Sequence, residues 1–135
     1  MMNTDYFNEA FKGFDPRTDK DAAMKFCLNA VLMDRRFADL KEILPNDTDL
    51  GGVAGEPNWI IERRNEGETK GYENWPQFAR FRAFVDPDSY ALAYSEFFCD
   101  KTTFEKFVSS AIQAYCDRHP ERGQEVESIL QILPR

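Results

Sequence analysis

The spacing of the apolar residues changes along this chain, and that change constrains the fold more than any other feature. Towards both ends the apolar side chains recur every three or four residues, which is the spacing of one helix face. Between residues 79 and 97 they alternate with polar side chains, as on one face of a strand. The sequence therefore predicts an α+β fold, with N- and C-terminal helices packed on a small antiparallel sheet.

Two helices are expected in the first 37 residues. A short amphipathic helix is expected in TDYFNEAFKGF, residues 4–14. Pro16 separates it from the next helix, because the residue before a proline prefers an extended conformation. The second helix is expected in residues 19–37, with Asp19 or Thr18 as its N-cap.

A turn and a loop are expected next. FADLKEIL, residues 37–44, either continues the second helix or restarts after a turn near Asp34 and Arg35, and Pro45 ends it. Residues 45–58, PNDTDLGGVAGEPN, predict a loop because Pro, Gly, Asn and Asp dominate them. The glycines of this loop lack the GxxxxGK(S/T) spacing and the lysine of a phosphate loop, so no phosphate site is expected.

Strands are expected in the middle of the chain. NWIIERR, residues 58–64, predicts one strand, and a charged connection follows it. ARFRAFV and SYALAYSEF alternate on either side of the turn Asp86-Pro87-Asp88, a pattern typical of a hairpin. The side chains expected to share a strand face are Phe81, Ala83 and Val85 in the first strand, and Tyr90, Leu92 and Tyr94 in the second.

Two helices are expected at the C-terminal end. Thr102 and Glu105 match a capping box, with Thr102 as the N-cap and Glu105 reaching back to its amide. Pro120 ends this helix and suits the first turn of the next. The apolar stripes are Phe104, Phe107, Val108, Ala111, Ile112 and Tyr115 in the first helix, and Val126, Ile129, Leu130 and Leu133 in the second.

Length and composition predict one folded domain over residues 1–135. The chain is 42% apolar and contains 12 Phe, which is enough to fill a single core. Its longest apolar runs are far shorter than a membrane span. The first residues, MMNTDYFNEAF, lack the basic start and apolar core of a signal peptide, so a cytoplasmic protein is expected.

The negative charge is concentrated in the first three quarters of the chain. The formal net charge is −7, divided as −3 over residues 1–49, −4 over residues 50–100 and zero over residues 101–135. Such a chain is not expected to bind nucleic acid or an anionic membrane, whereas a basic partner would be attracted to it. The last quarter of the chain, which has no net charge, is expected to support the fold and not to bind a partner.

The cysteines and the single histidine do not predict a metal, cofactor or catalytic site. Cys27, Cys99 and Cys116 lie far apart without a CxxC pair, so buried reduced thiols are expected. Cys116 and His119 are three residues apart, which allows a nucleophile with its base. If the helix ends at Pro120, however, His119 is its C-terminal cap. Cys116 then lies near the C-terminal end of the helix, whereas a thiol is activated at the N-terminal end.

The carboxylates also give no catalytic pair. Asp86 and Asp88 flank Pro87 in ordinary turn chemistry, and the run after Asp47 and Asp49 does not continue a calcium-binding pattern. Most other acids lie in charged, loop-like stretches where nothing would raise a carboxyl pKa. An enzyme is therefore not expected.

The stretch RNEGETKGYENWPQF is better explained as a recognition surface. Aromatic anchors among charges are favoured at interfaces, and anionic groups speed association with a cationic partner. The contact residues expected first are Glu66, Glu68, Tyr72, Glu73 and Trp75, with Asp86 and Asp88 as rim charges. The open alternative is that Tyr72 and Trp75 are core residues beneath a solvated acidic loop.

Three stretches resemble a known family: YFNEAFKGFDPR, FCLNAVLMDRRFADLKEIL and TFEKFVSSAIQAYCDRHPERGQEVESIL. They are similar to bacterial immunity proteins paired with the ribonuclease toxins of contact-dependent growth inhibition systems. KGYENWPQFARFR stands where that family has its Glu, Tyr and Phe segment.

The resemblance implies a non-enzymatic inhibitor, a monomer that forms a 1:1 heterodimer with its toxin nuclease and covers the active site. An acidic surface would then block the cationic cleft that a ribonuclease needs for its phosphates. The alternative is an acidic adaptor or inhibitor module for another basic protein. Two further rivals, which the residues disfavour, are a small enzyme using Cys116 or a carboxylate pair and a nucleic-acid-binding protein.

Overall fold

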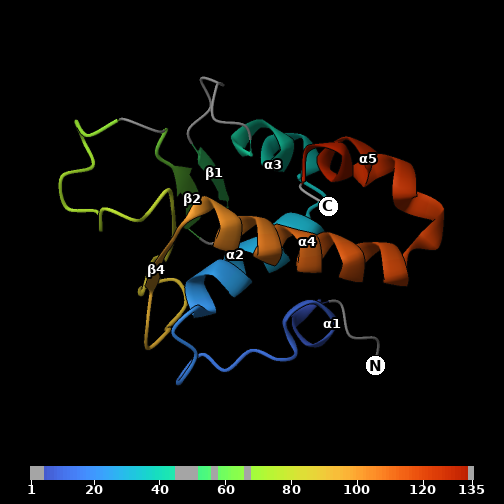
Figure 1. The fold of residues 1–135 in the computed structure, drawn as a ribbon. Coiled ribbons are helices and arrows are strands. Elements are labelled where there is room, and N and C mark those ends of the chain that lie inside the picture. The colour runs from blue at the N-terminus through green and yellow to red at the C-terminus, as the bar shows by residue number, and fades with distance from the viewer. Residues whose placement is uncertain (1–4, 45–51, 56–57, 66–67, 134–135) are drawn as a thin grey trace.

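The computed structural model describes residues 5–44, 52–55, 58–65 and 68–133, and these residues form an α+β fold (Figure 1). The predicted fold class is confirmed. In chain order the elements are α1 (Phe7–Phe11), α2 (Ala22–Met33), α3 (Phe37–Ile43), β1 (Gly52–Gly55), β2 (Trp59–Arg63), β3 (Phe81–Val85), β4 (Glu96–Cys99), α4 (Lys101–Arg118), the 3₁₀ turn η1 (Pro120–Arg122) and α5 (Gly123–Ile132).

The four strands form one antiparallel sheet in the order β1-β2-β3-β4. Every second residue of β2 and β3 is buried, and α2 packs on β2, β3 and β4 from that side. The predicted shared face of Phe81, Ala83 and Val85 is therefore confirmed as the inner face of the sheet. In Figure 1 the helices lie on one side of the sheet.

The core lies between this inner face and the helices. Phe81 of β3 stacks on Phe104 of α4 with ring centroids 3.8 Å apart, and both side chains are buried. The predicted stripe of α4 is confirmed, with Phe107 half-buried at its margin. Tyr115 closes the far end of the stripe against Phe37 of α3.

Two polar side chains tie the outlying segments to this core. The buried Asn29 of α2 accepts a hydrogen bond from the backbone amide of Tyr6 at 2.7 Å, which fixes the start of α1. The buried Arg63 of β2 donates to the carbonyl oxygens of Glu42 and Ile43 at 3.3 and 3.2 Å. A cation is favourable there because the last carbonyls of α3 carry the negative end of the helix dipole.

The predicted loop over residues 45–58 is wrong in part, because it contains the edge strand β1. Val53 of that strand is buried in the core, and Gly55 pairs with Trp59 of β2. A Cβ atom at Gly55 would lie 2.7 Å from the Trp59 ring. Glycine is therefore needed at residue 55 because the Trp59 ring lies against its backbone, and not because the chain turns there. Residues 45–51 and 56–57 of the predicted loop, among them Pro45, lie outside the described residues.

The predicted hairpin around Asp86-Pro87-Asp88 is wrong in part: β3 does pair antiparallel with the next strand, but that strand starts later than predicted. The chain after β3 turns on itself, with the amides of Ser89 and Tyr90 bonded to the Asp86 carbonyl, and β4 begins only at Glu96. The predicted second strand face of Tyr90, Leu92 and Tyr94 does not form. Tyr90 packs instead on Phe26 of α2, with ring centroids 4.8 Å apart.

Three predicted helix details differ as well. The N-cap of α4 is Asp100, which accepts a hydrogen bond from the Thr103 amide at 2.8 Å, whereas Thr102 lies inside the helix. The N-cap position of α2 is Asp21, which makes no side-chain cap. Leu130 of α5 is 49% exposed and does not belong to the buried stripe.

Replacing Asp100 with alanine should lower the free energy of unfolding by about 1 kcal/mol, the usual worth of an N-cap. The hydrogen bond from the Thr103 amide lowers the pKa of the Asp100 carboxyl. The stabilisation is therefore present above the unfolded-state pKa and is lost as the pH falls through the lower folded-state pKa. Urea denaturation of both proteins at pH 7 and at about pH 3 measures this difference. Thr102→Ala is the matched control, and a larger loss in that variant would contradict the assignment of the cap.

Candidate protein-binding surface

The sheet face turned away from the helices carries a mixed polar and aromatic surface. Cross-strand pairing places its side chains in two rows, one of Glu62, Arg82 and Phe98 and the other of Ile60, Phe84 and Glu96. We call these six residues the outer face. Glu96 is exposed and the other five are half-buried.

Arg82 organises the centre of the outer face. Its guanidinium donates to Glu62 Oε1 at 2.9 Å and to Glu96 Oε2 at 2.6 Å, and lies 4.7 Å above the ring of Phe84. One cation is thus shared by two carboxylates, which leaves this group of charges net negative. The contacts hold both acids in fixed positions on the face.

The connection between β2 and β3, residues 64–80, covers one end of the outer face, and we call it the recognition segment. Trp75 packs edge-on against Phe98, with ring centroids 5.3 Å apart, and Tyr72 packs edge-on against Trp75 at 4.9 Å. The Tyr72 hydroxyl donates to the Arg63 carbonyl at 3.4 Å. Tyr72 and Trp75 are half-buried, so they brace the segment and still present part of each ring to solvent. In Figure 1 the segment projects from the sheet on the side away from the helices.

Arg64 holds the base of the recognition segment. Its side chain is buried and donates to the Gln77 carbonyl at 2.9 Å, and its amide donates to the Arg80 carbonyl at 2.7 Å. A shallow hollow of about 210 Å³ lies beside it, lined also by Glu68 and Thr69. The two ends of the segment are therefore tied together where it leaves the sheet.

The predicted acidic contacts of this segment lie at its surface. Glu68 accepts a hydrogen bond from Asn65 at 3.2 Å, and Glu73 accepts one from the Gly71 amide at 3.1 Å. Backbone amides, first its own and then that of Gly71, lower the pKa of the Glu73 carboxyl. Burial, followed by the charges of Glu68 and Glu62, raises the pKa of Tyr72. Glu66 lies outside the described residues.

The predicted rim charges lie at the opposite end of the sheet. Asp86 and Asp88 follow the last residue of β3, whereas the recognition segment ends just before its first residue. The five residues of β3 separate the two groups by about 15 Å. Asp86 Oδ1 accepts a hydrogen bond from the Asp88 amide at 2.9 Å, which is the expected turn chemistry. The fold does not bring the two predicted groups together, although both border the outer face.

Sequence reasoning missed several residues of this surface. Phe78 of the recognition segment is 60% exposed, the highest exposure among the large apolar side chains that the structure describes. Glu62, Arg82 and Glu96 were not predicted as contacts because they lie on three different strands, and only the strand register brings them together. The alternation that places Phe81, Ala83 and Val85 inside also places Arg82 and Phe84 outside, so this signal was present in the sequence.

The cysteines and the histidine make no site of their own. His119 is the C-cap of α4, and its Nε2 lies 3.1 Å from the Tyr6 hydroxyl. Burial is the main cause that raises the pKa of all three thiols, that of Cys99 to about 12. Within the described ranges, no three His, Cys, Asp or Glu side chains are grouped as metal ligands. Among the described helices, none has the length and hydropathy to cross a bilayer.

The fold and this surface define an α+β chain with helices on one sheet face and a charged aromatic surface on the other. No protein-family model, curated protein or solved structure matched the chain. The family resemblance of the sequence motifs therefore stays a prediction.

Proposed function

We propose that this chain is an immunity protein that binds and neutralises the cognate toxin nuclease, a ribonuclease, of a contact-dependent growth inhibition system. The observation that carries the proposal is a sheet face that none of the described helices covers, where fixed carboxylates lie beside partly exposed aromatic rings. In this proposal the protein acts in the cytoplasm without a cofactor, as a monomer that forms a 1:1 complex. Glu66, Asp86 and Asp88 complete the proposed contact set.

Electrostatics supports a cationic partner. A ribonuclease holds its substrate through a cleft of Lys and Arg side chains. Glu68, Glu73 and Glu96 are exposed carboxylates that would meet such a cleft in place of phosphate groups. Surface charges of this kind act mainly on the association rate and on the choice of partner.

Aromatic side chains would supply the affinity. Phe78 and the exposed parts of Trp75 and Tyr72 lie in one segment, and Trp75 packs on Phe98 of the outer face. An aromatic side chain buries roughly 150–250 Å² on contact, and a few such anchors dominate most interfaces. A standard interface of about 1,600 Å² would extend from this segment across the outer face.

We expect the gene immediately upstream to encode the toxin nuclease domain. Reversing two carboxylates of the recognition segment, Glu68→Lys with Glu73→Lys, should slow association with that domain. We expect a loss of about tenfold or more in the association rate at low salt, shrinking as salt rises. Stopped-flow or surface-plasmon kinetics measure the rate. Glu121→Lys with Glu127→Lys makes the same charge change on exposed residues of η1 and α5. Equal slowing in both double variants would contradict the proposed surface.

Truncating the exposed anchor, Phe78→Ala, should speed dissociation of that complex and weaken binding about 30-fold, the effect of a hot-spot residue worth about 2 kcal/mol. Leu130→Ala is the control, because Leu130 is an exposed apolar side chain on α5. Neither change should alter the free energy of unfolding by more than about 0.5 kcal/mol. An unchanged dissociation rate for Phe78→Ala would remove the anchor from the account.

The same surface would also suit an acidic adaptor for a different basic protein. The two proposals differ in the identity of the partner. Capture from the native host that returns a basic protein other than a nuclease, together with no binding to the upstream-encoded domain, would favour the adaptor.

A further inference from the structure

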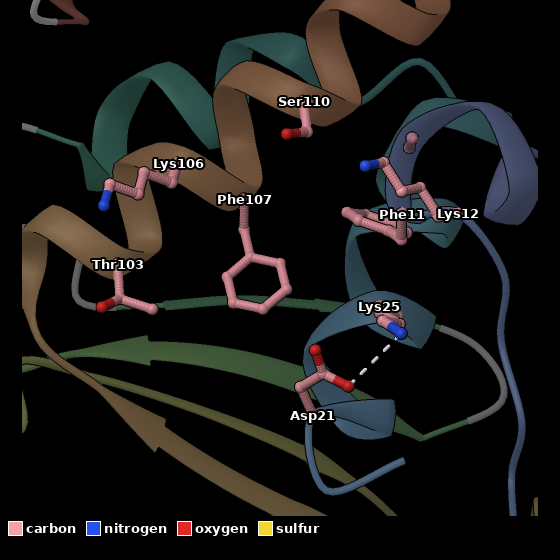
Figure 2. Close-up of a pocket in the computed structure, with 9 residues that line it drawn as sticks. Phe11, Lys12, Asp21, Lys25, Thr103, Lys106, Phe107 and Ser110 are labelled. Carbon is pink, nitrogen blue, oxygen red and sulfur yellow. Dashed lines mark ion pairs between the residues drawn. The ribbon is translucent and has the colours of Figure 1, made fainter.

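A second concave site lies among the helices, apart from the outer face. It is a pocket of about 370 Å³ between α1, α2 and the N-terminal half of α4 (Figure 2). This volume falls within the range of small-molecule sites, roughly 300–1,000 Å³. The proposed function makes no use of the pocket.

Two phenyl rings give the pocket an apolar part. Phe11 of α1 and Phe107 of α4 are both half-buried, and their ring centroids are 6.0 Å apart. Phe97 of β4 supports Phe107 from behind, with ring centroids 5.8 Å apart. Apolar surface of this kind favours a ligand with a hydrocarbon or aromatic body.

Cations and hydroxyls surround these rings. Lys25 of α2 is almost buried, and its ammonium is bound by Asp19 at 3.0 Å and Asp21 at 3.4 Å. Lys12 at the end of α1 makes no side-chain ion pair with any residue in the described ranges. Figure 2 shows the Lys12 side chain reaching from α1 towards α4, where Ser110 carries its hydroxyl. Lys106 also lines the pocket, but its ammonium points away from the other two lysines.

The backbone at Lys12 adds a second observation. Lys12 has φ 62°, the left-handed conformation that glycine or asparagine normally takes, and it is the C-cap of α1. A lysine there is less favourable for folding than glycine, and it places an ammonium at the mouth of the pocket. A cation also suits a helix C-terminus, so the test must separate these two roles.

We propose that this pocket binds a small organic anion, namely a carboxylate carried on a ring-sized apolar body. The carboxylate lies at the Lys12 ammonium and the Ser110 hydroxyl, and the body lies against Phe11 and Phe107. Lys25 contributes less, because Asp19 and Asp21 already neutralise it. On a chain of net charge −7, a local cation beside apolar surface is what selects an anion with an apolar part.

Titration with 3-phenylpropionate, followed by ¹H–¹⁵N NMR, tests the site. We expect saturable shifts of the Phe107 and Ser110 amides with a dissociation constant of about 1 mM or tighter, a value that fits a ligand of this size. 3-Phenylpropan-1-ol has the phenyl group without the charge, and acetate has the charge without the phenyl group. Each should bind about tenfold more weakly than 3-phenylpropionate, or not at all. No saturable shift with 3-phenylpropionate, or equal binding of the neutral alcohol, would overturn the proposal.

Variants of the pocket separate binding from folding. Lys12→Gly should melt at or above the wild-type temperature, because glycine takes φ 62° freely, yet bind 3-phenylpropionate about tenfold more weakly. Asp21→Asn removes a competing carboxylate without removing a cap, and should tighten binding. Lys41→Ala removes an exposed lysine of α3 outside the pocket, so it is the matched control and should bind as wild type does. Unchanged affinity in Lys12→Gly would refute the role of Lys12.

Discussion

The packing of α2 and α4 against one face of the sheet is the constraint on which the rest of the structure depends. The stacked pair of Phe81 and Phe104 lies at its centre and joins the third strand to the fourth helix. Because the side chains of a strand alternate, the same contact that buries Phe81 turns Arg82 to the other side. The outer face is thus a direct consequence of the core.

Most of the fold could be predicted from periodicity, and the exceptions have physical causes. The apolar stripe of α4 and the inner face of β3 could be predicted because the buried side chains of each element recur at a regular spacing in the sequence. The edge strand β1 was hidden because Gly52 and Gly55 usually mark a loop, whereas pairing with β2 and the close approach of Trp59 decide the conformation here. The alternation of Tyr90, Leu92 and Tyr94 was misleading, because Tyr90 packs on Phe26 of α2 and Tyr94 is 44% exposed, so these residues need no strand.

The candidate surface was predicted less completely than the fold. Composition alone pointed to the segment that holds Tyr72, Glu73 and Trp75. It could not show that Trp75 rests on Phe98, because that contact joins the connection between β2 and β3 to strand β4, 23 residues further along the chain. It also grouped Asp86 and Asp88 with the segment, although they lie at the other end of β3. Local patterns give the chemistry of a surface, and only the strand register gives its extent.

The central claim is that this chain inhibits a nuclease by occupying its cationic cleft with the outer face and the recognition segment. Its most direct test is the RNA-cleaving activity of the proposed toxin nuclease domain, purified and titrated with this protein at nanomolar concentrations. The account predicts a linear loss of activity that reaches completion at one equivalent, as expected for a tight 1:1 inhibitor. Full activity in the presence of a large excess of the protein would contradict it.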